Sequence, residues 1–138
     1  MTEEPRVKVA AIDDDDSILD TYEAGLAAAG FEVRTFFDPK RARVFFAEAP
    51  LREMPDVILM DIKMPGLDGI TLMNEIRSKD SAAHIPIIAV SGLTDTITLS
   101  DALLFGAMDY VEKPFDLVAL SDKINKAAAL SRKRAPKP

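Results

Sequence analysis

The chain has 138 residues, 48% hydrophobic and 29% charged, the profile of one globular domain with enough apolar material for a core. Seventeen basic and 23 acidic residues give a net charge of −6, which argues against direct nucleic-acid binding by this domain. The chain has no cysteine and one histidine, His84, which excludes thiolate chemistry and argues against a multi-histidine metal site or a Ser-His-Asp hydrolase. Neither a membrane-length apolar run nor a signal-peptide pattern is found, so we expect a cytoplasmic location with no membrane partner.

Apolar residues alternate along the chain between short β-branched runs and longer stretches with helical periodicity. Gly30 is placed to end the first helix, Pro39 to open the second, and residues 57–60 are apolar throughout, as in a strand buried on both faces. The predicted strands cover residues 7–12, 31–36, 57–60, 85–90 and 108–111. The predicted helices that alternate with them cover residues 17–29, 39–49, a stretch that follows Asp68-Gly69 and ends at Ile76, 94–105 and 116–130. Strict alternation predicts an α/β fold, a doubly wound parallel sheet with helices on both faces.

The one shift in composition lies at the C-terminus. Residues 131–138 hold basic residues, two prolines and no acid. We therefore divide the chain into a domain over residues 1–130 and a basic, Pro-containing tail or start of a linker over residues 131–138. A basic arm that contacts an acidic partner is the alternative interpretation of this segment.

Polar and charged side chains follow several of the predicted strands. Residues 13–16 are all aspartate and follow the first strand, Asp61 follows the third, Ser91 the fourth and Lys113 the fifth. Because the carboxyl ends of parallel strands lie at one edge of a sheet, we expect these groups to converge there. Converging carboxylates repel one another without a cation, and an oxygen ligand set free of Cys and His favours Mg²⁺ over zinc.

Other acidic residues have simpler interpretations. Asp15 and Asp16 are expected to cap the N-terminus of the first helix, and Asp68-Gly69 to provide turn chemistry and capping for the third. His84 is expected to be a loop residue. Asp13, Asp14 and Asp61 could also be plain caps or salt-bridge partners, but the arrival of Lys113 at the same edge disfavours that interpretation.

Four separated motifs occur in order over residues 7–130: Ile12-Asp13-Asp14, Met60-Asp61-Ile-Lys-Met64-Pro65-Gly-Leu-Asp-Gly69, Ser91-Gly92, and Tyr110-Val-Glu-Lys113-Pro114-Phe115. Together they resemble the receiver domains of bacterial two-component response regulators. The resemblance implies a (βα)₅, flavodoxin-like fold with strand order 2-1-3-4-5, as in a chemotaxis receiver. It also implies a signalling domain rather than an enzyme, which takes a phosphoryl group from a histidine kinase or histidine phosphotransfer protein.

The resemblance also assigns roles at the phosphoryl site. Asp61 would be the nucleophile that becomes an aspartyl phosphate. Asp13, Asp14 and Asp61, with the backbone carbonyl of Lys63, would hold Mg²⁺. Lys113 would pair with a phosphoryl oxygen, aimed by a cis bond to the proline that follows it.

Two further residues would transmit the effect of phosphorylation to the surface of the domain. Ser91 would donate its hydroxyl to the phosphoryl group, and Tyr110 would turn inward or outward with the state of Ser91. The surface of the fourth helix, fifth strand and fifth helix would then switch. Two residues depart from the commonest receiver pattern, Lys63 after the third strand and Leu93 after the fourth. We expect both to border the phosphate and to lengthen its lifetime.

Two alternatives belong to other functional classes. Asp13-Asp14-Asp15 also matches the Asp-x-Asp element of haloacid-dehalogenase-type phosphatases, with Asp13 as nucleophile and Asp15 as acid or base. That interpretation leaves Asp61 unexplained and lacks an acidic pair after the last strand. The other alternative is a receiver-like module that binds partners without phosphorylation, although every chemical residue is present.

Overall fold

The computed structural model describes residues 6–62, 64, 67–92, 103–104 and 106–134. Its five parallel strands form one sheet in the order β2-β1-β3-β4-β5. The strands are β1 (Lys8–Ile12), β2 (Glu32–Phe36), β3 (Val57–Asp61), β4 (Ile87–Gly92) and β5 (Asp109–Lys113). The predicted α/β class and strand order are therefore confirmed.

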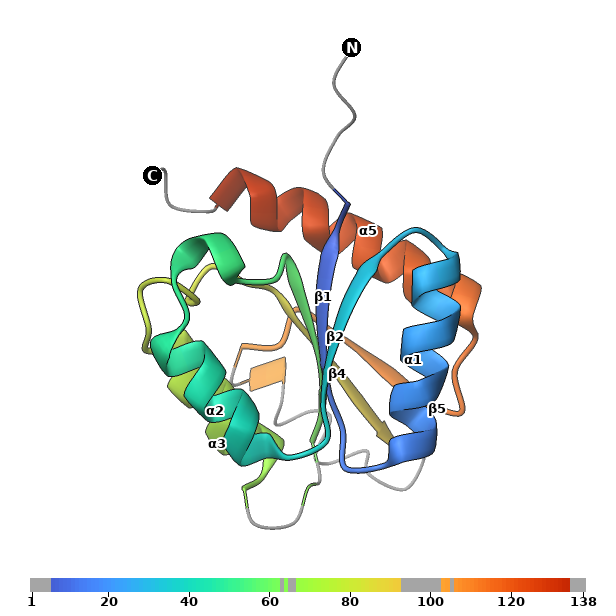
Figure 1. Ribbon diagram of the computed structural model, residues 1–138, viewed down its shortest axis with the longest axis horizontal. Coiled ribbons are helices and arrows are strands. Elements are labelled where there is room, and N and C mark those ends of the chain that lie inside the picture. Colours follow the sequence, from blue (N-terminus) through green and yellow to red (C-terminus); the bar gives the residue numbers. More distant parts are fainter. Residues whose placement is uncertain (1–5, 63, 65–66, 93–102, 105, 135–138) are drawn as a thin grey trace.

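Helices cover both faces of the sheet, with α1 and α5 on one side and α2 and α3 on the other (Figure 1). None of the described helices is both long enough and apolar enough to cross a membrane. The helix predicted over residues 94–105 falls almost entirely outside the described residues, so the labels pass from α3 to α5. The bounds are α1 (Asp16–Ala28), α2 (Pro39–Glu48), a 3₁₀ turn η1 (Leu51–Glu53), α3 (Gly69–Arg77) and α5 (Leu117–Arg134).

The ends of α1 and α3 follow from local sequence. The Asp15 carboxylate accepts the backbone N–H of Ser17 at 2.9 Å, and the Asp68 carboxylate accepts that of Thr71 at 2.8 Å. Each bond satisfies an N–H that a helix leaves without a partner in its first turn. Gly30 follows α1 with φ of 97°, a left-handed conformation that glycine adopts at low cost. The capping roles predicted for Asp15, Asp68 and Gly30 are confirmed, whereas the one predicted for Asp16 is wrong, because Asp16 is the first residue of α1 and Asp15 occupies the cap.

The sheet separates two apolar clusters. Every residue of β3 is buried, and its side chains alternate between them: Ile58 and Met60 pack towards α2 and α3, Val57 and Leu59 towards α1 and α5. A strand packed on both faces has little freedom to move. The carboxyl end of β3, where Asp61 lies, is therefore held by the core itself.

The last helix is longer than the sequence predicts, because α5 continues through Arg134 instead of ending at Leu130. Ser131 is buried at 1% exposure, and the Arg132 guanidinium lies 3.5 Å from the Asp56 carboxylate. Asp56 also accepts the backbone N–H of Lys8 at the start of β1, at 2.9 Å. These contacts extend the helix, so the predicted division at residue 130 falls inside it.

Candidate functional site

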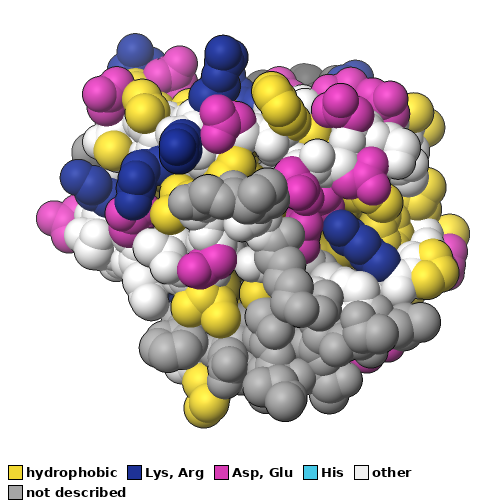
Figure 2. Space-filling model, turned by 90° about the horizontal axis from the view of Figure 1, so that it is seen from below, with side chains coloured by type: hydrophobic (Ala, Val, Ile, Leu, Met, Phe, Trp, Pro, Cys, Tyr) yellow, Lys and Arg dark blue, Asp and Glu magenta, His cyan; other side chains and the backbone are white. Residues whose placement is uncertain are grey.

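Acidic groups gather at the carboxyl edge of the sheet. Asp13, Asp14 and Asp61 each offer one carboxylate oxygen, and these oxygens all lie within 4.8 Å of one another. Figure 2 looks onto this edge and shows acidic side chains beside a basic one. Asp13 and Asp61 are buried while Asp14 is exposed, so the cluster opens to solvent on one side. The convergence predicted from the strand ends is present.

Both oxygens of Asp13 have partners. Its Oδ1 accepts the backbone N–H of Asp15 at 3.0 Å, and its Oδ2 accepts a bond from Lys113 Nζ at 2.8 Å. Lys113 Nζ also lies 3.7 Å from Asp61 Oδ2. Burial lowers the pKa of Lys113, but the hydrogen bond to Asp13 and the negative charges of Asp13, Asp61 and Asp14 outweigh it, so the pKa is raised. Lys113 therefore remains a cation between two carboxylates.

Asp61 is the last residue of β3 and pairs in register with Val90 of β4. The first residue of α3, Gly69, packs against the backbone at Asp61 and Ile62, and a Cβ atom at Gly69 would overlap it. Its N–H donates to the Ile62 carbonyl at 2.8 Å. Gly69 therefore has a packing role at the site in addition to its predicted turn role.

Strand pairing places the remaining candidate residues. Ser91 is buried at 1% exposure and pairs with Glu112, and the next pair joins Gly92 to Lys113. Tyr110 lies on β5 with 42% exposure, its side chain outward. The Lys113-Pro114 peptide bond is cis, as the resemblance implies. Ser91 and Lys113 thus come from adjacent strand ends, next to Asp61.

The donor set fits a hard divalent cation such as Mg²⁺, because carboxylate oxygens within one coordination sphere are its preferred protein ligands. Asp14 is open to solvent, which allows water to complete the coordination shell. Lys63 and Leu93, the predicted carbonyl ligand and lifetime residues, lie outside the described residues.

An aromatic pair beside the site was not predicted from the sequence. The rings of Tyr22 in α1 and Phe115 after β5 stack with centroids 5.4 Å apart and planes 6° from parallel. Burial, and to a smaller extent the negative charges of Asp13 and Asp61, raise the pKa of Tyr22, so its hydroxyl is neutral. In the sequence, Tyr22 is one of several apolar positions in an amphipathic helix. Its contact with Phe115 depends on the packing of α1 against the chain after β5, which the sequence pattern does not show.

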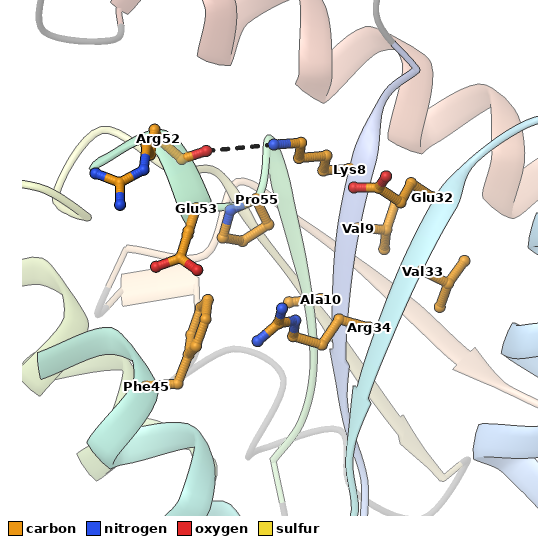
Figure 3. Close-up of a pocket in the computed structure, with 10 residues that line it drawn as sticks. All are labelled: Lys8, Val9, Ala10, Glu32, Val33, Arg34, Phe45, Arg52, Glu53 and Pro55. Atoms are coloured by element: carbon orange, nitrogen blue, oxygen red, sulfur yellow. Dashed lines mark hydrogen bonds between the residues drawn. The ribbon is translucent and has the colours of Figure 1, made fainter. Parts of the chain in front are cut away.

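A hollow of about 240 Å³ lies elsewhere, over β1 and β2 and beside α2 and η1 (Figure 3). Two of its cations are engaged within the protein: Lys8 Nζ donates to the Arg52 carbonyl at 3.3 Å, and the Arg34 guanidinium lies 4.7 Å from the Phe45 ring centroid. The carboxyl edge, with its convergent carboxylates and lysine, is the stronger candidate for chemistry.

The fold and this site define a class: doubly wound α/β domains that carry their ligand site outside the carboxyl ends of the strands. The family model of the response regulator receiver domain matches residues 9–125, and the chain belongs to this family. It is 35% identical over 123 residues to the regulatory protein AtoC of Escherichia coli, covering 89% of this chain and 25% of AtoC. The chain spans between a quarter and about half of the first curated relatives it matches.

Solved structures agree with this assignment. A response regulator receiver domain protein from Clostridium thermocellum is similar with a TM-score of 0.78 and 31% identity, over 93% of this chain and 97% of that one. The receiver domain of the sensor histidine kinase PA1611 from Pseudomonas aeruginosa has a TM-score of 0.79 and 26% identity, over 91% and 99%. The latter structure has a magnesium ion coordinated in its active site cleft.

Proposed function

We propose that this receiver domain takes a phosphoryl group onto Asp61 from a phosphohistidine of a histidine kinase or histidine phosphotransfer protein. The observation that carries the proposal is the placement of Lys113 Nζ, 2.8 Å from Asp13 and 3.7 Å from Asp61, within a cluster of three carboxylates. A cation held beside a nucleophilic carboxylate can bind a phosphoryl oxygen as charge develops on it. The cytoplasmic location predicted from the sequence stays a prediction.

In the transfer, an Asp61 oxygen bonds to phosphorus while the bond from phosphorus to the donor imidazole nitrogen breaks. The nitrogen keeps the bonding electrons and the donor imidazole leaves. Lys113 would exchange its bond to Asp13 for one to a phosphoryl oxygen, and Ser91 would donate its hydroxyl to another. Mg²⁺, when bound, supplies positive charge at the transferring oxygens.

Asp13, Asp14 and Asp61 would hold the Mg²⁺, together with the carbonyl of Lys63. We expect Mg²⁺ to raise the melting temperature of the wild type and to do so much less in Asp14→Ala. Binding to the folded state alone adds about 1.4 kcal/mol at a concentration ten times Kd. Asp20→Ala, which removes an exposed carboxylate from α1, is the matched control and should keep the full Mg²⁺ effect. Equal stabilisation of Asp14→Ala and wild type would remove Asp14 from the metal site.

Phosphorylation would be transmitted from Ser91 to Tyr110, and from there to the surface of the fourth helix, β5 and α5. The support is geometric. Ser91 is buried on β4 and directly follows Val90, the residue that pairs with Asp61, while Tyr110 is half exposed on the neighbouring strand β5. Drawing Ser91 towards the new anion vacates space that an inward Tyr110 can fill. NMR shifts recorded with and without beryllofluoride should change chiefly on this surface. Changes confined to α1 and α2 would contradict the proposal.

The lifetime of the phosphorylated state would depend on Lys63 and Leu93, each two positions beyond a strand-end group. A cation and a bulky aliphatic side chain would hinder the water that attacks phosphorus opposite the aspartyl oxygen. The double variant Lys63→Asn, Leu93→Glu should lose phosphate faster, and each ~1.4 kcal/mol of barrier is tenfold in rate. Loss of phosphate is followed with Mg²⁺ present and the donor removed. An unchanged or slower rate would overturn the assignment.

The proposed function is tested by locating the phosphoryl group. The wild-type chain is incubated with phosphoramidate and Mg²⁺, and borohydride then reduces the acyl phosphate, which releases phosphate and leaves homoserine at the acceptor. Mass spectrometry locates this homoserine as the label. A label on Asp61 supports the proposal. A label on Asp13 instead favours a haloacid-dehalogenase-type phosphatase, and no label favours a receiver-like module that acts without phosphorylation.

A further inference from the structure

We infer that Tyr22 is a positioning residue, which holds Lys113 in place for phosphoryl transfer by stacking on Phe115. This inference rests on the proposed function of Asp61 and Lys113. The inference gives α1, which contributes none of the strand-end groups of the site, a role in positioning Lys113.

The ring pair joins two segments on either side of the site. Tyr22 lies in α1, which begins just after the acidic residues, and Phe115 lies two positions after Lys113. The near-parallel rings, 5.4 Å apart, form an aromatic contact worth more than its buried area alone. Tyr22 is only 1% exposed, so its ring has no room to leave the stack without repacking the core.

A second contact, one helical turn further along α1, fixes the same segment. A Cβ atom at Gly25 would lie 2.5 Å from a terminal methyl of Leu117, so the absence of a side chain at Gly25 admits Leu117 against the helix. Tyr22 and Gly25 face the same way at a spacing of three residues. They therefore contact Phe115 and Leu117, alternate residues of the chain that leaves β5.

Lys113 lies directly before this clamped segment. Its backbone is paired with Gly92 on the β4 side, and it is the last residue of β5. Lys113 Nζ reaches Asp13 and Asp61 from this backbone, so a displacement of the backbone changes the distances from Nζ to both carboxylates. The Tyr22–Phe115 stack restrains the backbone just after Lys113, where the pairing of β5 with β4 ends.

The aromatic ring of Tyr22, rather than its hydroxyl, carries this role. The contact with Phe115 is made by the ring, and the hydroxyl, whose pKa is raised by burial and by the nearby carboxylates of Asp13 and Asp61, adds no charge beside Lys113. Tyr22→Phe keeps the stack and should therefore keep the function. Tyr22→Leu keeps an apolar side chain in the core but removes the stack.

The test compares single-turnover phosphorylation by phosphoramidate across a small set of variants. We expect Tyr22→Leu and Phe115→Leu each to lower the rate constant by about tenfold, because small displacements of a positioned group slow catalysis strongly. The double variant should be no slower than either single one, since both remove the same contact. Tyr22→Phe should retain the wild-type rate, and the Kd for Mg²⁺ should be unchanged throughout.

Leu26→Ala is the control for a general loss of core packing. Leu26 lies one turn beyond Tyr22 in the same apolar cluster and is fully buried, so its truncation destabilises the fold without removing the ring pair. It should lower the melting temperature and leave the phosphorylation rate near that of the wild type. If the phosphorylation rate falls as much in Leu26→Ala as in Tyr22→Leu, the loss follows from lower stability. Tyr22 would then have only a packing role in the core, and the inference would be overturned.

A spectroscopic readout separates this inference from the proposed function. The ¹H–¹⁵N signal of the Lys113 ammonium group, assigned through Lys113→Met, should shift in Tyr22→Leu and hold its position in Tyr22→Phe and Leu26→Ala. A wild type that takes up no phosphoryl group would refute the proposed function, while this signal still judges the positioning role. A signal unmoved in Tyr22→Leu would refute the inference whatever the wild type does.

Discussion

Asp61→Asn is expected to abolish acid-labile phosphorylation and to leave the fold intact. The amide has the shape of the carboxylate but lacks the nucleophilic oxygen that bonds to phosphorus. Asp61 ends β3, a buried strand that pairs with β1 on one side and β4 on the other, so the strand does not depend on this side chain. Uptake of phosphoryl groups from ³²P-labelled donor, with circular dichroism as the check on folding, measures both parts.

Asp68→Asn is the matched control. It makes the same chemical change at the cap of α3, where asparagine serves about as well as aspartate, and should be phosphorylated like the wild type. Without Mg²⁺, Asp61→Asn should be the more stable protein by about 1 kcal/mol, because one of three crowded like charges is gone. Wild-type uptake by Asp61→Asn, or a lower melting temperature in EDTA, would contradict this account.

Lys113→Met should have two large effects. The rate of phosphorylation is expected to fall by about 10²-fold, the usual cost of removing a group that stabilises charge in a transition state. The metal-free protein should lose about 1–3 kcal/mol, because buried Asp13 is left without its cation. The loss is smaller than for a fully buried pair, since the Lys113 side chain is 22% exposed.

Mg²⁺ should restore more stability in Lys113→Met than in the wild type, because a new cation enters a cluster that has lost its own.

The pKa of Lys113 is raised on folding, so the contribution of Lys113 to folding stability is complete below the unfolded pKa of about 10.4. This contribution is lost only as the pH rises through the folded pKa. The destabilisation should therefore be constant from about pH 6 to pH 9. Lys123→Met, which breaks the 2.7 Å surface pair with Asp109, should show neither the rate loss nor the enhanced Mg²⁺ effect.

The sequence predicts most accurately the features that depend on neighbours in the chain. The apolar run of β3, the caps Asp15 and Asp68, and the glycine after α1 are local patterns, and each appears where it was expected. The convergence of Asp13, Asp61 and Lys113 could also be predicted, because parallel strands bring their carboxyl ends to a common edge.

Features that depend on distant partners could not be predicted. β4 was expected over residues 85–90 but runs from Ile87 to Gly92, because pairing with β5 extends its carboxyl end. At its other end, the Ile85 carbonyl instead accepts a bond from the Arg77 guanidinium. α5 gains its last turn through Arg132 and Asp56, and the Tyr22–Phe115 stack joins residues that no periodicity links.

The bond between Lys113 and Asp13 spans 100 residues of sequence. Closing so long a loop directly costs conformational entropy, so we expect this contact to form after the intervening strands have docked. During synthesis Asp13, Asp14 and Asp61 leave the ribosome well before Lys113 does. An incomplete chain that stops short of Lys113 carries these three aspartates but lacks the lysine that pairs with Asp13. If Asp61 is the phosphoacceptor that we propose, competence to take a phosphoryl group would be the last property that the growing chain acquires, and only a fully assembled copy would compete for donors.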